Sequence, residues 1–117
     1  MKLLLRSAKT LKDLDACVAM YSNSPYGVDP AMTIDVEFAR TNLFRLWMTP
    51  SYNLRMAEKG GVLFGWLLSR EGVNSYHSSG RSLEQLYYVT DQEGFLAARC
   101  LKALHEDLVE IARAKEI

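Results

Sequence analysis

The chain is 117 residues long, a length that suits one domain with a real hydrophobic core rather than two domains. Its residues are 49% hydrophobic and 24% charged, as in an ordinary globular protein. The formal net charge is +0, which excludes a general attraction to nucleic acid or to an acidic membrane surface. No apolar run approaches the roughly 20 residues of a membrane span. We therefore expect a single domain over residues 1–117, with no nucleic-acid and no membrane partner.

Both cysteines, Cys17 and Cys100, fall within apolar helical patterns. Buried, reduced thiols in a cytoplasmic protein are the favoured interpretation, and a disulfide is the alternative. The cysteine and histidine residues show no spacing typical of a zinc site, so no metal is expected.

The first half of the chain predicts one strand and two helices. The apolar run Leu3–Leu5 is typical of a short buried strand. A helix is predicted from Leu11 to about Tyr21, and a second helix from near Thr33 to just before Pro50, because the residue before a proline is disfavoured in a helix. The apolar positions that define the two helices are Leu11, Leu14, Val18 and Tyr21 in the first and Val36, Ala39, Leu43, Leu46 and Trp47 in the second.

The middle of the chain predicts a hairpin. Alternation over Leu54–Glu58 predicts a half-buried strand, and Lys59–Gly61 predicts a turn. The almost wholly apolar run Val62–Leu68 predicts a central strand covered on both faces. Gly65 inside that run indicates a bulge or a close backbone approach. The polar segment Arg70–Arg81 predicts a loop.

The last third predicts a strand, a tight turn and a closing helix. Ser82–Val89 is the predicted strand, Thr90–Gly94 the turn, and Phe95 begins the helix. The apolar stripe of that helix is Ala97, Leu101, Leu104, Leu108 and Ile111. A strand that leads into a helix N-terminus through a short turn is where many folds hold an anionic cofactor, since the macrodipole makes that end partially positive. The order of elements predicts an α+β fold with a mostly antiparallel sheet flanked by helices.

This order, and several local motifs, resemble the Gcn5-related N-acetyltransferase (GNAT) family. The similar segments are Lys2–Ala8 for the opening strand, Met20–Tyr26 for the loop after the first helix, Ala57–Trp66 for the hairpin with its two spaced glycines, and Leu86–Val89 for the fourth strand, which lies against acetyl-CoA. The resemblance spans nearly the whole chain. It implies a GNAT-like α+β fold, acetyl-CoA as the cofactor, and transfer of an acetyl group to an amine on a protein or a small molecule.

Two departures from the family pattern affect the implied activity. The family's pyrophosphate loop, Arg/Gln-x-x-Gly-x-Gly/Ala, has its nearest match at Glu93–Ala98, where Glu93 replaces the basic or amide residue and Leu96 the central glycine. A carboxylate repels a pyrophosphate, and a leucine side chain blocks the close backbone approach that glycine allows. The family also continues with further C-terminal strands, so the resemblance is to a short or C-terminally truncated member that lacks one wall of the cofactor cleft.

The resemblance implies one catalytic residue and six cofactor-binding residues. Glu84 lies on the fourth strand, where some family members place a general base for the attacking amine, and a solvent-facing strand residue is the alternative. The cofactor-binding candidates are Tyr88, Val89, Gly94, Ala97, Ala98 and Arg99. Ordinary strand pairing is the alternative for Tyr88 and Val89, and a solvated helix face is the alternative for Arg99.

Two functions therefore remain open, beside a plain structural α+β domain whose likeness to the family is accidental. The first is an N-acetyltransferase with Glu84 as base. The second is a catalytically inactive GNAT-fold protein, viral for example, that acts as a protein-binding or structural protein. The fourth strand would then be an open sheet edge, which is a template for strand addition. We accordingly expect a homo-oligomer or a protein partner.

Overall fold

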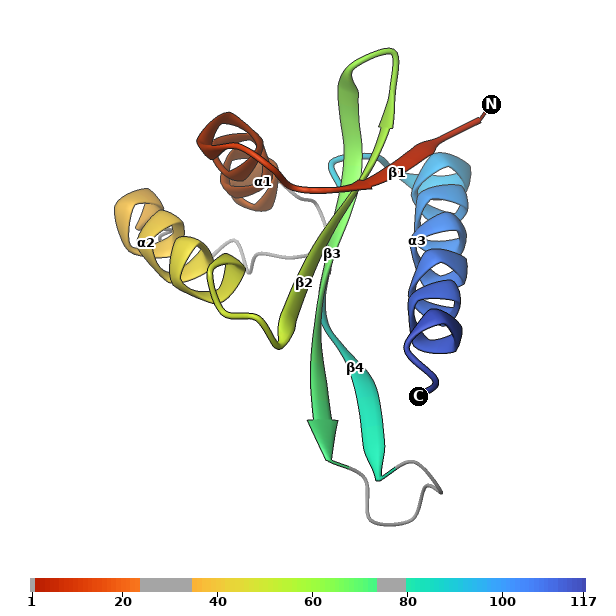
Figure 1. Cartoon of the computed structure of the whole chain (residues 1–117). Helices are drawn as coiled ribbons and strands as arrows, with labels where there is room; N and C mark the ends of the chain where they lie inside the picture. Colours follow the sequence, from red (N-terminus) through yellow and green to blue (C-terminus); the bar gives the residue numbers. More distant parts are fainter. Residues whose placement is uncertain (1, 24–34, 74–79) are drawn as a thin grey trace.

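The computed structural model describes residues 2–23, 35–73 and 80–117, which form an α+β fold (Figure 1). This part of the chain has one antiparallel sheet of four strands in the order β1-β2-β3-β4. Helices α1 and α2 lie on one face of the sheet and α3 lies on the other (Figure 1). The elements are β1 (Leu4–Ser7), α1 (Leu11–Asn23), α2 (Val36–Trp47), β2 (Tyr52–Lys59), β3 (Val62–Val73), β4 (Arg81–Val89) and α3 (Gly94–Ala114). The predicted α+β class and antiparallel sheet are confirmed.

The starts of α1 and α2 are fixed by side chains that bind the first backbone N–H groups. Thr10 Oγ1 accepts a hydrogen bond from the Asp13 backbone N–H at 3.1 Å, and the Asp13 carboxylate accepts one in return from the Thr10 N–H at 3.3 Å. Asp35 is the N-cap of α2 and accepts from the Phe38 N–H at 3.0 Å. Helix α2 therefore begins at Val36, while Thr33, its predicted start, lies outside the described residues.

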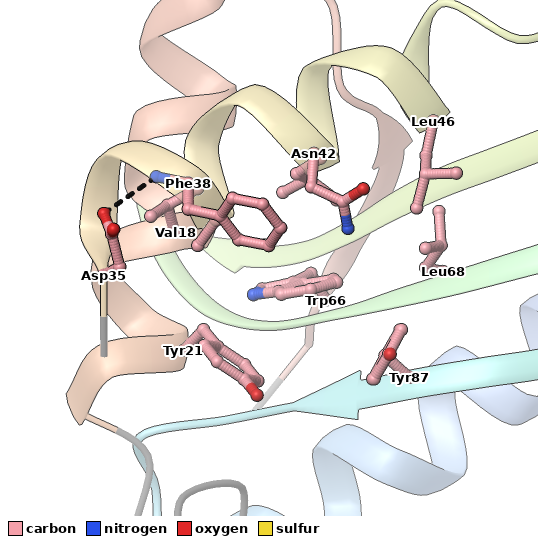
Figure 2. A pocket seen from close by; sticks show the side chains of 11 residues that line it. Val18, Tyr21, Asp35, Phe38, Asn42, Leu46, Trp66, Leu68 and Tyr87 are labelled. Atoms are coloured by element: carbon pink, nitrogen blue, oxygen red, sulfur yellow. Dashed lines mark hydrogen bonds between the residues drawn. The ribbon is translucent and has the colours of Figure 1, made fainter. Parts of the chain in front are cut away.

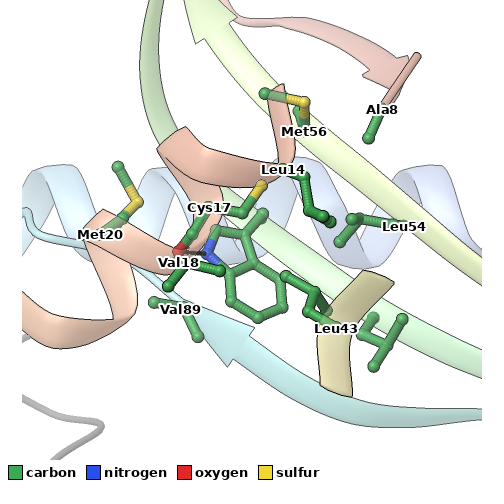
Figure 3. Close-up of a cluster of buried hydrophobic side chains, with 11 residues drawn as sticks. Ala8, Leu14, Cys17, Val18, Met20, Leu43, Leu54, Met56 and Val89 are labelled. Carbon is green, nitrogen blue, oxygen red and sulfur yellow. Dashed lines mark hydrogen bonds between the residues drawn. The ribbon is translucent and has the colours of Figure 1, made fainter. Parts of the chain in front are cut away.

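The hydrophobic core has two parts, one on each face of the sheet. Figure 3 shows the part between the sheet and helices α1 and α2, where the Trp66 indole N–H donates to the Cys17 carbonyl at 3.0 Å. The residues of this cluster are Ala8, Leu14, Cys17, Val18, Met20, Leu43, Leu54, Met56, Trp66, Leu68 and Val89. The second part, under α3, consists of Ala57, Leu67, Cys100, Leu104 and Leu108. Strand β3 supplies both clusters, so the prediction of a central strand covered on both faces is confirmed.

Gly65 produces both effects that its position in the apolar run indicated. The pairing of β2 with β3 shifts register at this point, because Ala57 pairs with Gly65 while Glu58 pairs with Leu63. A Cβ on Gly65 would also lie 2.5 Å from the Sγ of Cys100. The missing side chain lets α3 pack closely on the sheet. It also explains why the buried stripe of α3 contains Cys100, whereas Leu101, a predicted stripe residue, is 39% exposed.

The predicted loop over Arg70–Arg81 is wrong at both of its ends. Strand β3 continues to Val73 and β4 begins at Arg81, while residues 74–79 lie outside the described part of the chain. Polar residues form strand here because they pair across the two strands with opposite charge, as Arg70 does with Glu84 at 2.8 Å.

Both cysteines are free and buried, which confirms the prediction of two buried thiols without a disulfide between them. Burial raises the pKa of the Cys17 thiol to about 12, and it also raises the pKa of Cys100. Each thiol is therefore protonated at neutral pH. The thiolate is the nucleophilic form, so neither cysteine suits covalent catalysis.

Candidate functional site

The turn between β4 and α3 is held in place by Thr90. The Thr90 side chain is buried, and its hydroxyl donates to the Phe64 carbonyl at 2.6 Å and accepts from the Gln92 N–H at 3.0 Å. These two bonds tie the turn to strand β3. The predicted strand, turn and helix are confirmed, with α3 beginning at Gly94, one residue before the predicted Phe95.

The N-cap residue of α3 does not cap the helix with its side chain. Glu93 is the N-cap residue, but its carboxylate accepts no capping hydrogen bond, and the first turn of the helix contains no acidic residue. Gly94 has a φ of +58°, a conformation that a side chain would strain, and open space lies where its Cβ would be. An anion could therefore approach the backbone of this helix end, and the nearby Glu93 carboxylate is the charge that opposes it.

Tyr88 links the end of β4 to the first turns of α3. Its hydroxyl donates to the Ala97 carbonyl at 2.8 Å. Ala98 and Arg99 are exposed on the next positions of the helix, and the Arg99 guanidinium lies 5.6 Å from the centre of the Phe95 ring. The structure thus brings the six predicted cofactor-binding residues together around one strand end and one helix end.

The outer edge of β4 offers backbone groups suited to an extended ligand. Among the described residues, β4 pairs with β3 alone and is an edge strand. In an antiparallel ladder, successive residues point their N–H and C=O groups alternately toward the partner strand and away from it. Tyr88 and Val89 are neighbours, so one of them presents both groups to the outer side. That arrangement suits an extended ligand that carries amide groups.

Glu84 lies apart from the other candidates. It is on the face of the sheet that carries α1 and α2, because it pairs with Arg70, which is two residues beyond the inward-facing Leu68 on β3. Tyr88 is on the opposite face, packed with the residues beneath α3. Four residues of extended strand also separate Glu84 from Tyr88, or about 13 Å.

A cavity of about 350 Å³ lies on the same face as Glu84, between α1, α2 and the strands β3 and β4 (Figure 2). Its walls are mostly apolar and aromatic, and Asp35 is the one charged residue among the described residues that line it. The lining residues are Val18, Tyr21, Asp35, Phe38, Ala39, Asn42, Leu43, Leu46, Trp66, Leu68 and Tyr87. The size and character of this cavity suit a small organic ligand.

No protein-family model matches the chain, and no curated protein matches it. Solved structures of acetyltransferases do match it over nearly its whole length. A predicted acetyltransferase of Clostridium acetobutylicum, solved with acetyl-CoA, has a TM-score of 0.68 at 15% identity, covering 99% of this chain and 77% of that chain. The chain has the GNAT fold.

Two further matches to this fold have different named activities. Ribosomal-protein-alanine N-acetyltransferase of Brucella melitensis matches with a TM-score of 0.69 at 17% identity, over 99% of this chain and 75% of that one. Glucosamine-6-phosphate N-acetyltransferase of Arabidopsis thaliana matches with a TM-score of 0.68 at 11% identity, over 98% and 77%. The matched chains are longer than this one, and the described residues contain no fifth strand beside β4. The resemblance inferred from the sequence is thus confirmed at the level of the fold.

The sequence patterns did not reveal the cavity of this GNAT fold. They assigned Val18, Tyr21, Ala39, Leu43 and Leu46 to the apolar stripes of two helices, and these residues do face the sheet. A usable signal was Phe38, an aromatic residue outside the stripe, which is 72% exposed and forms part of the cavity wall.

Other site chemistries find no support in the described residues. Within 2–23, 35–73 and 80–117, no group of three or more His, Cys, Asp or Glu side chains is placed to hold a metal ion. No helix in this part of the chain is long and apolar enough to cross a membrane.

Proposed function

We propose that the chain is an acetyl-CoA-dependent N-acetyltransferase, which transfers an acetyl group to an amine. The observation that carries this proposal is the arrangement of Tyr87 and Tyr88, neighbours on β4. Tyr87 lines the cavity beneath α1 and α2, while Tyr88 lies under α3 and binds Ala97. A donor along the outer edge of β4 and an acceptor in the cavity would meet at this strand.

The cofactor-binding roles follow from the chemistry of the C-terminal end of β4 and the N-terminal end of α3. The outward backbone groups of Tyr88 or Val89 would bind the pantetheine amides. The dipole of α3 at Gly94 would attract the pyrophosphate. The small side chains of Ala97 and Ala98 would leave room for the pyrophosphate beside the helix. The Arg99 guanidinium adds a positive charge on the same turns. Bound acetyl-CoA would supply an activated thioester.

Glu84 is the proposed general base. Glu84 is on the same face of the sheet as Tyr87, and its carboxylate lies beside Arg70 and not among the described residues that line the cavity. There it would accept a proton from the attacking amine, directly or through a water molecule. Arg70, whose guanidinium binds Glu84 at 2.8 Å, would hold the carboxylate in position.

Calorimetry with acetyl-CoA tests this proposal directly. Binding in the micromolar range is expected, and the substitution Ala98→Glu should weaken it about tenfold, because a carboxylate on this exposed position would repel the pyrophosphate. Ala114→Glu, at the exposed far end of the same helix, is the matched control and should bind normally. Absence of heat at millimolar acetyl-CoA would contradict the enzyme assignment.

A second candidate function is favoured by the edge position of β4 together with the Glu93 carboxylate at the helix end. In this candidate the GNAT fold is catalytically inactive, and the outer edge of β4 binds another protein or a second copy of the chain. Mass measurement of the assembly in solution tests it. A dimer or larger oligomer without acetyl-CoA binding supports this candidate, whereas a monomer that binds acetyl-CoA contradicts it.

A further inference from the structure

The cavity between α1, α2 and the sheet indicates which class of acceptor this chain uses. We infer that the acceptor is an amine on an uncharged aromatic or branched apolar body, with its amine toward Tyr87 and its far end toward Asp35. This inference rests on the proposed function and names the acceptor for the same site. It follows from three features of the cavity: its central walls, its charge and its direction.

The central walls of the cavity offer apolar contact and little hydrogen bonding. Trp66 forms one wall, and its indole N–H is already bound to the Cys17 carbonyl at 3.0 Å. Its ring face is what remains for a ligand. Phe38 lies on α2 across from Trp66, and Leu46 and Leu68 extend the apolar surface (Figure 2). A flat ring or a branched alkyl group would fill this space without leaving a polar group unpaired.

The charge of the cavity disfavours an anionic acceptor. Among the described residues that line the cavity, Asp35 is the one charged residue, and none of them is a lysine or an arginine. The Asp35 carboxylate already accepts the Phe38 N–H at 3.0 Å, so this N–H of the α2 N-terminus is not available to an anionic acceptor. A phosphate or carboxylate on the acceptor would lie beside a like charge, and the described part of the wall holds no counter-ion for it. An uncharged body, or one that donates a hydrogen bond, meets no such penalty.

The direction of the acceptor follows from the position of β4. In Figure 2, Asp35 and Phe38 lie at one end of the cavity, and Tyr87 and Leu68 lie at the other. The Tyr87 end is the one formed by β4, the strand that also carries Glu84 and the cofactor-binding residues. The reacting amine therefore belongs at the Tyr87 end, and the rest of the molecule extends along Trp66 toward Asp35.

A matched pair of probes tests the charge of the far end by calorimetry, with acetyl-CoA absent. The probes are 4-phenylbenzylamine and the same molecule with a carboxylate on the 4′ carbon, the position farthest from the amine. We expect the uncharged probe to bind about tenfold more tightly, because the carboxylate would approach Asp35. Asp35→Asn should reduce this ratio to about threefold or less, and the helix start should survive because asparagine is an equally good N-cap.

A second pair of variants tests the walls. Phe38→Ala should weaken binding of 4-phenylbenzylamine about tenfold, since it removes an aromatic contact. Phe44→Ala is the control, because Phe44 is an exposed phenylalanine of the same helix that does not line the cavity. The affinity of the Phe44→Ala variant for 4-phenylbenzylamine should equal that of the parent protein.

The outcomes separate this inference from the proposed function. Failure of both probes to bind, equal binding of the two probes, or equal affinities of the Phe38→Ala and Phe44→Ala variants would overturn the inference, whatever the result with acetyl-CoA. If the probes behave as expected and acetyl-CoA does not bind, the amine selectivity of the cavity stands and the acetyltransferase assignment fails.

Discussion

Gly65 and Cys100 approach so closely that a Cβ on Gly65 would lie 2.5 Å from the Cys100 Sγ. Both residues are buried, and the Val89 carbonyl oxygen lies 3.1 Å from the same Cβ position. Strand β3, helix α3 and the last residue of β4 therefore meet at one glycine. The distance of α3 from the sheet, and with it the position of its N-terminus beside β4, depends on this contact.

Gly65→Ala should destabilise the protein by about 1–3 kcal/mol, because the added methyl group cannot be accommodated without moving the helix or the strand. Denaturant unfolding of the two proteins measures the difference in the free energy of unfolding. Cys100→Ala should relieve the steric clash in the Gly65→Ala variant, since it removes the sulfur atom that the new Cβ would meet. The double substitution should cost less than the sum of the single ones. Additive costs would show that the methyl group strains something other than this contact.

Asp13 makes the stability of the fold depend on pH. The Arg6 guanidinium, at 2.8 Å, holds the pKa of the Asp13 carboxyl well below its usual range, and the backbone N–H groups of Lys9 and Thr10 add to this effect. A carboxyl whose pKa is lower in the folded state contributes stability above its unfolded pKa, and that contribution is lost as the pH falls toward the folded pKa. The loss should therefore set in below about pH 4.

Asp13→Asn tests this dependence. The variant should be less stable than the parent by roughly 2 kcal/mol at neutral pH, and the gap should narrow as the pH falls below about 4. Asp15→Asn is the control on the same helix, because Asp15 forms an exposed ion pair with Arg40, and the loss of this pair should lower stability much less than Asp13→Asn does. A gap for Asp13→Asn that stays constant with pH would contradict the assigned role.

The sequence was sufficient for the fold where local signals and periodicity agree. Gly65 inside an apolar run predicted a bulge and a close approach, and both are present. The apolar run of β3 predicted a strand with two covered faces. The sequence-based prediction was wrong at Arg70, where a polar segment predicted a loop. Arg70 is in a strand because it pairs with Glu84 on the neighbouring strand. Cross-strand partners of this kind are not visible in the sequence of one strand.

The relation between Glu84 and the cofactor-binding residues could not be predicted for a similar reason. Simple alternation places Glu84, Leu86 and Tyr88 on one face of the strand. The pairing of β4 with β3 instead shifts register near Leu86, since Tyr87 pairs with Leu68 while Gln85 pairs with Ser69. This bulge puts Glu84 and Tyr88 on opposite faces. It also turns Tyr87 toward the cavity, which no periodic pattern indicated.

Glu93→Gln should strengthen binding of acetyl-CoA about threefold to tenfold. The substitution removes a carboxylate from the N-cap position of α3, where it would repel a pyrophosphate. Stability should change little, because the Glu93 side chain makes no capping hydrogen bond. Calorimetry at low ionic strength gives the largest difference, since salt screens an exposed charge. Glu110→Gln, near the other end of the helix, is the control and should leave the affinity unchanged; an equal gain from both variants would contradict a local effect of Glu93.

Glu84→Gln should lower the turnover number about 100-fold or more while leaving the affinity for acetyl-CoA unchanged, because the amide cannot accept the proton of the attacking amine. Arg70→Gln is the control, since it breaks the same exposed ion pair and keeps the carboxylate. Loss of that pair should change stability little in either variant, because solvent screens an exposed ion pair. If Glu84 is the base, turnover falls far more in Glu84→Gln than in Arg70→Gln. Equal losses would indicate that the pair acts by positioning alone, and unchanged turnover in Glu84→Gln would exclude it as the base.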